Sequence, residues 1–159
     1  HGLRLFGMRA LMSLRLEKNY GTWFREYRPI YTPLESGITR YIKLDHDFIG
    51  REAYERELAA GTPARTLVAM VVEPDPDDPA DVIGDEPIWH AGEVVGWVTS
   101  GGYLHHAKAS LALGYVPTAL ASPDGPGGNG FEIEIIGNRR PARLQPRPLF
   151  DPDGLRMRQ

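Results

Sequence analysis

The chain has no cysteine among its 159 residues, which excludes disulfides, thiolate catalysis and cysteine-ligated clusters. It has no run of about 18 apolar residues and no signal-peptide pattern, so nothing in it indicates export or membrane insertion. The formal net charge is −3, and this balance gives no reason to expect nucleic acid or an anionic membrane as a partner. We therefore expect a cytoplasmic protein.

Several signatures of catalytic sites are missing as well. His105 and His106 are adjacent, so in a strand they point to opposite faces and cannot bind one ion together. Thr99-Ser100-Gly101 lacks the Gly-x-Ser-x-Gly setting of a nucleophile, and its hydroxyls are expected to satisfy backbone groups where a strand ends. The chain has no phosphate loop and no candidate flavin fingerprint. We predict neither a metal site nor a catalytic residue in it.

What the chain has in quantity is turn residues, with 18 glycines and 14 prolines. Many turns are typical of a β-barrel or a sandwich rather than a helix bundle. After Arg65 the alternating and β-branched runs predict about six short strands, enough to close a barrel. The expected strands cover residues 66–72, 88–90, 94–99, 111–116, 131–136 and 143–148. Ser100-Gly101-Gly102 is expected to break the third of them.

The residues before Arg65 predict a mixture of helices and one strand. Apolar residues at helical spacing predict a helix over residues 6–16, and Arg51 to Ala60 predict another that ends at Gly61. Thr32-Pro33-x-Glu35 is a favourable helix opening, with Thr as N-cap and Pro at the first position. Residues 39–44 alternate well enough to predict a strand.

Glu17 ends the apolar run of the first helix, and such a run usually delivers its last residue to the edge of something buried. A carboxylate there can accept two parallel N–H donors from one flat heterocycle. Composition alone favours the alternative of a surface Glu17 paired with Arg15 or Lys18, because charged residues are mostly exposed. The dense aromatic residues that follow are either core beneath a loop or a wall for a flat ligand. They are Tyr20, Trp23, Phe24, Tyr27 and Tyr31.

Arg51 also admits two interpretations. A helix N-terminus offers unpaired N–H groups and the Arg adds a fork of donors, so carboxylates suit this place. Alternatively, Arg51 is exposed and pairs with Glu55 one turn later.

The chain resembles a known family over five blocks. Ser-Leu-Arg-Leu-Glu-Lys-Asn-Tyr at 13–20, followed by Trp23 and by Thr-Pro-Leu-Glu-Ser-Gly at 32–37, is similar to the folate-binding portion of dimethylglycine and sarcosine dehydrogenases. Those enzymes share the signature, more loosely, with the glycine cleavage T-protein, in the aminomethyltransferase superfamily. Further matches follow in the right order at 47–53, 95–101 and 148–152. The chain departs from the pattern at Asn19, where relatives tend to have Gly, and at Phe24.

The resemblance implies roles for four residues. It implies that Glu17 anchors the pterin of tetrahydrofolate by accepting from its ring N–H and exocyclic amine, with Tyr20 and Trp23 in the same binding stretch. In relatives the region of Arg51 lies near the benzoyl-glutamate tail of the folate. The catalytic Asp and the FAD are expected in an N-terminal part that precedes these residues. We therefore expect no turnover from this fragment alone, and His1-Gly2 is consistent with a chain cut from a longer one.

The predicted fold class is α+β. We expect a partial folate-binding domain over residues 1–63, a Greek-key-like six-stranded β-barrel over 64–152, and a tail over 153–159. The predicted function is the tetrahydrofolate-binding C-terminal part of a flavin-dependent N-methyl amine dehydrogenase, which hands a one-carbon unit to tetrahydrofolate. The rest of its own polypeptide is the expected partner. The alternatives are part of a glycine-cleavage aminomethyltransferase or folate-dependent demethylase, and a non-catalytic barrel that braces a larger assembly.

Overall fold

A closed six-stranded antiparallel β-barrel forms the body of the molecule, and the computed structural model describes residues 2–128 and 130–158. The strands are β1 (Arg65–Val72), β2 (Pro87–His90), β3 (Glu93–Leu104), β4 (Ala109–Pro117), β5 (Phe131–Ile135) and β6 (Asn138–Leu144). They follow the order β1-β4-β3-β2-β5-β6 around the barrel, and β6 closes it against β1. The predicted six-stranded barrel is therefore confirmed. Its non-sequential pairings are β1 with β4, β2 with β5 and β1 with β6.

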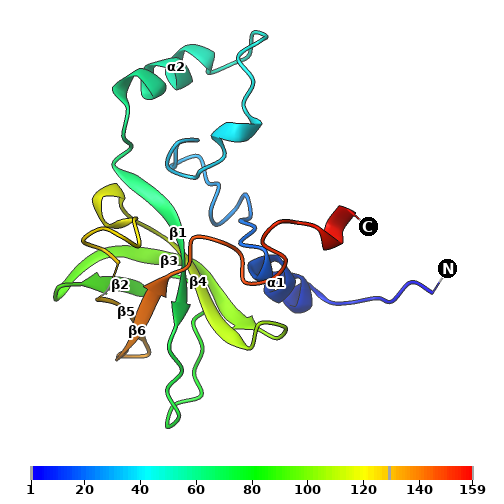
Figure 1. Ribbon diagram of the computed structural model, residues 1–159, viewed down its shortest axis with the longest axis vertical. Helices are drawn as coiled ribbons and strands as arrows, with labels where there is room; N and C mark the ends of the chain where they lie inside the picture. The colour runs from blue at the N-terminus through cyan, green and yellow to red at the C-terminus, as the bar shows by residue number, and fades with distance from the viewer. Residues whose placement is uncertain (1, 129, 159) are drawn as a thin grey trace.

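The helices lie outside the barrel (Figure 1). They are α1 (Met8–Glu17), α2 (Arg51–Ala60) and the short 3-10 helices η1 (Thr39–Tyr41), η2 (Thr118–Leu120) and η3 (Arg156–Arg158). Figure 1 shows α1 beside the barrel, with both chain ends on that side, and α2 at the far end of the N-terminal segment. Within the described ranges, no helix has the length and apolarity needed to cross a membrane.

The predictions for α1 and α2 are confirmed to within two residues, and the strand predicted over 39–44 is wrong. Those residues contain η1 and no strand, because alternation alone cannot form a strand without a neighbour to pair with. Thr32 and Glu35 make the reciprocal hydrogen bonds of a capping box, with N···O distances of 3.0 and 3.2 Å. Only a turn follows, because Gly37 adopts φ 68° and ends it.

Two of the strand predictions are also wrong. β3 continues through the expected break to Leu104, with a bulge between Val98 and Ser100. Gly101 is a member of this strand, and the position requires glycine because a Cβ there would lie 2.6 Å from the Val82 side chain. The last strand begins at Asn138 rather than near 143, since Ile136 and Gly137 both have positive φ and form a tight hairpin turn.

The barrel has an inner core and a second apolar cluster on its outer surface. The inner core includes Met70, Val72, Ile88 and Ile133, all essentially inaccessible to solvent. Leu16 of α1 packs on the outer surface in the second cluster, which contains Ala69, Leu104, Leu111 and Leu113. β1 is therefore covered on both faces, which explains why it reads as a continuous apolar run.

The carboxylate of Glu26 is fully buried between α1 and the barrel. Its Oε2 accepts from Arg15 Nη1 at 3.0 Å and from the Thr22 amide at 2.7 Å, and its Oε1 accepts from Thr99 Oγ1 at 2.7 Å and Ser100 Oγ at 2.5 Å. Burial lowers the pKa of Arg15, and the facing carboxylate opposes that shift. The two charges are therefore mutually dependent inside the protein.

The bulge in β3 makes this arrangement possible. Successive side chains of a regular strand point to opposite faces, yet Thr99 and Ser100 both reach Glu26. A bulge places two residues opposite one on the neighbouring strand and redirects a side chain. Thr99 shares its one hydroxyl hydrogen between Glu26 Oε1 and the Leu113 carbonyl, which is 3.0 Å away. The expected backbone role of these hydroxyls therefore holds for Thr99 and is secondary to Glu26.

The Glu26→Ala variant should lose about 3–5 kcal/mol of unfolding free energy, because it leaves Arg15 buried without its partner. Chemical denaturation followed by circular dichroism measures this loss. Glu52→Ala is the matched control, since Glu52 faces Arg56 in an exposed pair 3.9 Å apart and such pairs contribute little. Equal stabilities for the two variants would contradict the role assigned to Glu26.

Candidate functional site

The last turn of α1 presents a buried carboxylate at the edge of the barrel. Glu17 is only 4% exposed, because Leu16 beside it packs into the outer apolar cluster. Its Oε1 accepts from the His106 amide at 2.8 Å, in the turn between β3 and β4. Its Oε2 is buried and has no hydrogen-bond partner among the described residues.

The surface interpretation of Glu17 is therefore wrong. Arg15 pairs with Glu26 and Lys18 with Asp151, at N···O distances of 3.0 and 3.3 Å. A buried carboxylate oxygen without a donor costs free energy that a ligand N–H group can recover. Glu17 has the chemistry of an anchor for a ring that carries N–H donors.

The C-terminal segment holds this carboxylate in place from the other side. The Phe150 amide donates to the Glu17 carbonyl at 3.2 Å, and the Phe150 ring packs edge-on against His106 with centroids 4.6 Å apart. Lys18 donates to the backbone carbonyl and the carboxylate of Asp151. Arg156 lies over the Phe150 ring at 5.4 Å, so the predicted tail contacts the site.

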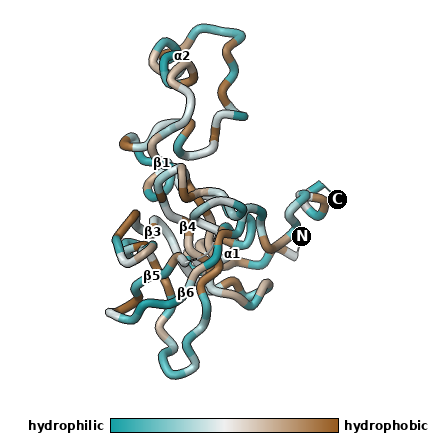
Figure 2. The backbone as a smooth tube through the Cα atoms, turned by 60° about the vertical axis from the view of Figure 1, so that its left-hand side comes forward, coloured by the Kyte–Doolittle hydropathy of each residue, from teal (hydrophilic) through white to brown (hydrophobic). Residues whose placement is uncertain are grey.

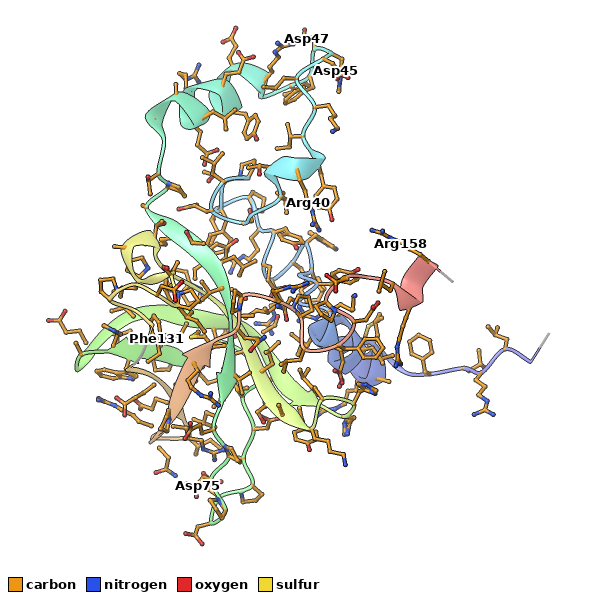
Figure 3. All side chains as sticks on the ribbon, viewed as in Figure 1. Arg40, Asp45, Asp47, Asp75, Phe131 and Arg158 are labelled. Atoms are coloured by element: carbon orange, nitrogen blue, oxygen red, sulfur yellow. The ribbon has the colours of Figure 1, made fainter. Side chains whose placement is uncertain are left out.

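A groove of about 650 Å³ begins at the end of α1. Lys18, Asn19 and Tyr20 line it, together with residues of β1 and of the C-terminal segment, while Glu17 is not among the lining residues. Arg40 and Arg158 also line the groove; Figure 3 shows them on the N-terminal segment and on η3, above α1 in that view. The groove thus combines apolar walls with cationic side chains.

The aromatic residues divide between the two interpretations. Tyr20 and Tyr27 line the groove, as a ligand wall requires. Tyr31 belongs to the core, because it stacks on Tyr115 with centroids 3.7 Å apart and accepts from Trp97 Nε1 at 3.1 Å. Trp23 is 76% exposed and is not a lining residue of the groove.

Arg51 lies at the N-terminus of α2, away from the groove. Its Nε bonds the Glu55 carboxylate at 2.9 Å and its Nη1 donates to the His46 carbonyl at 3.0 Å. Of the four predicted binding residues, Tyr20 lines the groove, whereas Glu17, Trp23 and Arg51 do not. Among residues 2–128 and 130–158, no group of three or more His, Asp or Glu side chains is arranged to hold a metal.

Sequence reasoning missed two residues beside the site. Glu26 fixes the turn that carries Glu17, and no motif marks a buried carboxylate in an irregular segment. Asn19 adopts φ 53°, a left-handed conformation that glycine adopts without strain and asparagine tolerates. The signal in the sequence that marked this left-handed position was the Asn at a place where relatives tend to have Gly.

Comparisons with known proteins agree with this geometry. The sequence profile of the glycine cleavage T-protein C-terminal barrel domain matches residues 65–151. The mitochondrial dimethylglycine dehydrogenase of Mus musculus is 39% identical over 150 residues, which cover 93% of this chain and 16% of that protein. The mitochondrial sarcosine dehydrogenase of Mus musculus is 33% identical over 163 residues, which cover 99% of this chain and 17% of that protein.

Two further comparisons involve aminomethyltransferases. That of Parasynechococcus marenigrum is 34% identical over 151 residues, covering 94% of this chain and 39% of that protein. The crystal structure of glycine cleavage system aminomethyltransferase T from Bartonella henselae superposes with a TM-score of 0.77 at 23% identity, over 92% of this chain and 39% of that one. This likeness shows the fold. The chain spans 16–17% of the length of the dehydrogenases that it matches.

Two core tyrosines and one tyrosine of the groove wall predict a loss of stability at alkaline pH. Burial raises the pKa of Tyr115, Tyr31 and Tyr27, so the folded chain retains protons that the unfolded chain releases near pH 10. The free energy of unfolding should fall as pH rises above about 10. Tyr115→Phe should make that decline shallower, although it also removes the hydroxyl's 2.8 Å bond to the Glu26 carbonyl. Chemical denaturation of wild type and Tyr115→Phe between pH 8 and pH 11 measures the decline for each protein. Parallel curves of unfolding free energy against pH for the two proteins would contradict the assignment of the decline to Tyr115.

Proposed function

Because this chain belongs to the family of the glycine cleavage T-protein C-terminal barrel domain, we propose that it is the tetrahydrofolate-binding part of a larger one-carbon enzyme. The favoured enzyme is a flavin-dependent dehydrogenase of an N-methyl amine such as dimethylglycine or sarcosine. Its relatives of highest identity support this branch. The domain division at 1–63, 64–152 and 153–159 and the cytoplasmic location stay predictions.

The observation that carries the proposal is the unpaired Oε2 of Glu17. The His106 amide holds the other oxygen, so the carboxylate has one acceptor committed to the protein and one that stays buried and unpaired until a donor reaches it. A pterin carries adjacent N–H donors that suit such an acceptor. Tetrahydrofolate, when bound, would supply the nitrogen that accepts the one-carbon unit.

Other residues of the site would bind and orient rather than react. Tyr20 and Tyr27 line the groove and offer flat apolar surfaces for a ring. Trp23 stays in the proposal as a residue of the same stretch, although it is exposed and does not line the groove.

The proposed partner is the rest of the same polypeptide. Large apolar side chains outside the barrel are exposed on α1 and on the loops after it, and Figure 2 shows apolar positions around α2 as well. They include Leu11, Leu14, Trp23, Ile30 and Ile49. Exposed apolar surface of this kind marks an interface, and the dehydrogenase relatives are about six times longer than the matched segment.

An aminomethyltransferase is the second candidate function, supported by the relative from Parasynechococcus marenigrum, of which this chain covers 39%. Amine-dependent reduction of a flavin by the full-length protein would support the dehydrogenase and exclude the aminomethyltransferase.

The Glu17→Gln variant of the full-length enzyme should bind tetrahydrofolate more weakly by about 2–4 kcal/mol, because an amide donor then faces ligand donors. Oxidation of the amine takes place elsewhere in the proposed enzyme and should continue. The expected result is uncoupling, in which the amine is consumed and free formaldehyde appears. Titration with tetrahydrofolate and an assay for formaldehyde measure the two effects.

Glu93→Gln is the matched control, since Glu93 is an exposed glutamate at the start of β3. It should leave both readouts unchanged. Equal folate affinity and equal coupling in wild type and Glu17→Gln would refute the role of Glu17.

Arg51→Ala tests the proposed place of the folate tail. The guanidinium would have to exchange its bond to Glu55 for a tail carboxylate. In the full-length enzyme the variant should weaken binding of polyglutamylated tetrahydrofolate more than that of a pterin without the tail. Arg56→Ala, in the exposed pair with Glu52 on the same helix, is the control. Equal losses for both ligands would remove Arg51 from the site.

A further inference from the structure

The charged side chains that line the groove at the end of α1 are mostly cationic. They are Lys18, Arg40, Asp153 and Arg158. Lys18 is paired with a carboxylate and Asp153 with a guanidinium, in each case from a residue that does not line the groove. Arg40 and Arg158 form no ion pair with an Asp or Glu within residues 2–128 and 130–158. The groove therefore carries two positive charges that the described chain does not neutralise.

These two arginines differ from those elsewhere in the described chain. Eight other arginines form ion pairs with an Asp or Glu. Arg40 and Arg158 come from opposite ends of the chain, and Figure 3 shows both above α1 in that view. Two like charges that line one groove repel each other, and an anion between them reverses the sign of that energy. The groove thus favours a ligand with negative charge.

Both guanidinium groups are positioned by neighbouring residues. Arg40 Nη2 donates to the Tyr41 hydroxyl at 2.6 Å, and its guanidinium lies 4.7 Å from the centroid of the Tyr41 ring. A guanidinium has five N–H donors, so most of them stay available to a ligand. Arg158 lies on η3, where the Asp151 carboxylate accepts from the amides of the first residues at 2.8 and 3.3 Å. Side chains held in advance lose less entropy when a ligand binds.

The walls of the groove are apolar and partly aromatic. Tyr20, Tyr27, Ile38 and Leu113 contribute to them. The volume of about 650 Å³ lies within the range of about 300–1,000 Å³ that small-ligand sites occupy. A ligand that suits this lining has a flat apolar part for the walls and carboxylates for the arginines.

We propose that Arg40 and Arg158 form a carboxylate subsite of this groove, which binds an aromatic dicarboxylate. The identity of that ligand rests on the proposed function, in which it is the benzoyl-glutamate part of tetrahydrofolate, whose first glutamate carries two carboxylates. Each guanidinium fork matches the two oxygens of a carboxylate. The subsite is independent of Glu17, which does not line the groove, and of Arg51, which lies away from it and is left for a later residue of a polyglutamate.

Three ligands separate the subsite from the pterin anchor. They are tetrahydrofolate with one glutamate, a tetrahydropterin without the tail, and p-aminobenzoyl-glutamate, which has the tail without the pterin. Each is titrated calorimetrically, under anaerobic conditions, into the full-length enzyme and its Arg40→Gln and Arg158→Gln variants. Arg28→Gln is the matched control, because Arg28 is also exposed and without an acidic partner among the described residues but does not line the groove. Thermal unfolding checks that each variant is folded.

Arg40→Gln and Arg158→Gln should each weaken binding of the two ligands with a tail about 3- to 10-fold, between the effects of an exposed ion pair and a buried charged hydrogen bond. The tail-less pterin should bind equally to all proteins, and Arg28→Gln should behave as wild type. High salt should weaken binding of the tailed ligands more in wild type than in either variant.

Unchanged affinity for the tailed ligands in both variants, or an equal loss for the tail-less pterin, would overturn the subsite and leave the proposed function intact. A wild-type enzyme that does not bind tetrahydrofolate would overturn the proposed function. Binding of p-aminobenzoyl-glutamate by that same enzyme, weakened in both variants, would still support a carboxylate subsite, for an aromatic dicarboxylate other than folate.

Discussion

The buried carboxylate of Glu26 is the interaction on which the position of the candidate site depends. It joins Arg15 of α1 to Thr99 and Ser100 of β3, across more than 70 residues of sequence. Apart from these bonds, α1 contacts the barrel through Leu16 in the outer apolar cluster, through the Ser13 hydroxyl on the Tyr103 carbonyl at 2.8 Å and through Glu17 on the His106 amide. The buried charged network adds to these contacts in fixing the orientation of the helix. The direction of Glu17 is therefore set by residues that do not belong to the groove.

Two glutamates within ten residues thus differ in how their burial is compensated. Glu26 has donors for both carboxylate oxygens, while Glu17 has the His106 amide for one oxygen and nothing described for the other. Native proteins leave few buried polar atoms unpaired, and those few need an explanation. A fully satisfied carboxylate serves the fold. A half-satisfied one keeps an acceptor that a ligand donor can pair, as the proposed function requires.

The sequence predicted the barrel well because period-two alternation and tight turns are local signals. It failed where a distant partner decided the outcome. Gly101 reads as a strand breaker until Val82 is known to occupy the space of its Cβ, and residues 39–44 alternate without a strand to pair with. At the site, the resemblance favoured a binding role for Glu17, whereas composition alone favoured the surface. Glu26 has no local signal at all, because what defines it is a bulge 73 residues later.

The groove has walls from three parts of the chain, and polar anchors hold two of these parts to each other. Lys18 bonds Asp151, and the Phe150 amide bonds the Glu17 carbonyl, so polar contacts tie the C-terminal segment to the end of α1. In the proposed function, a ligand that donates to Glu17 binds this arrangement, and mass action then stabilises the folded arrangement in return. The anchors would then contribute to recognition by holding Glu17 in place. Any population with α1 detached would lower the apparent affinity for the ligand by the same fraction.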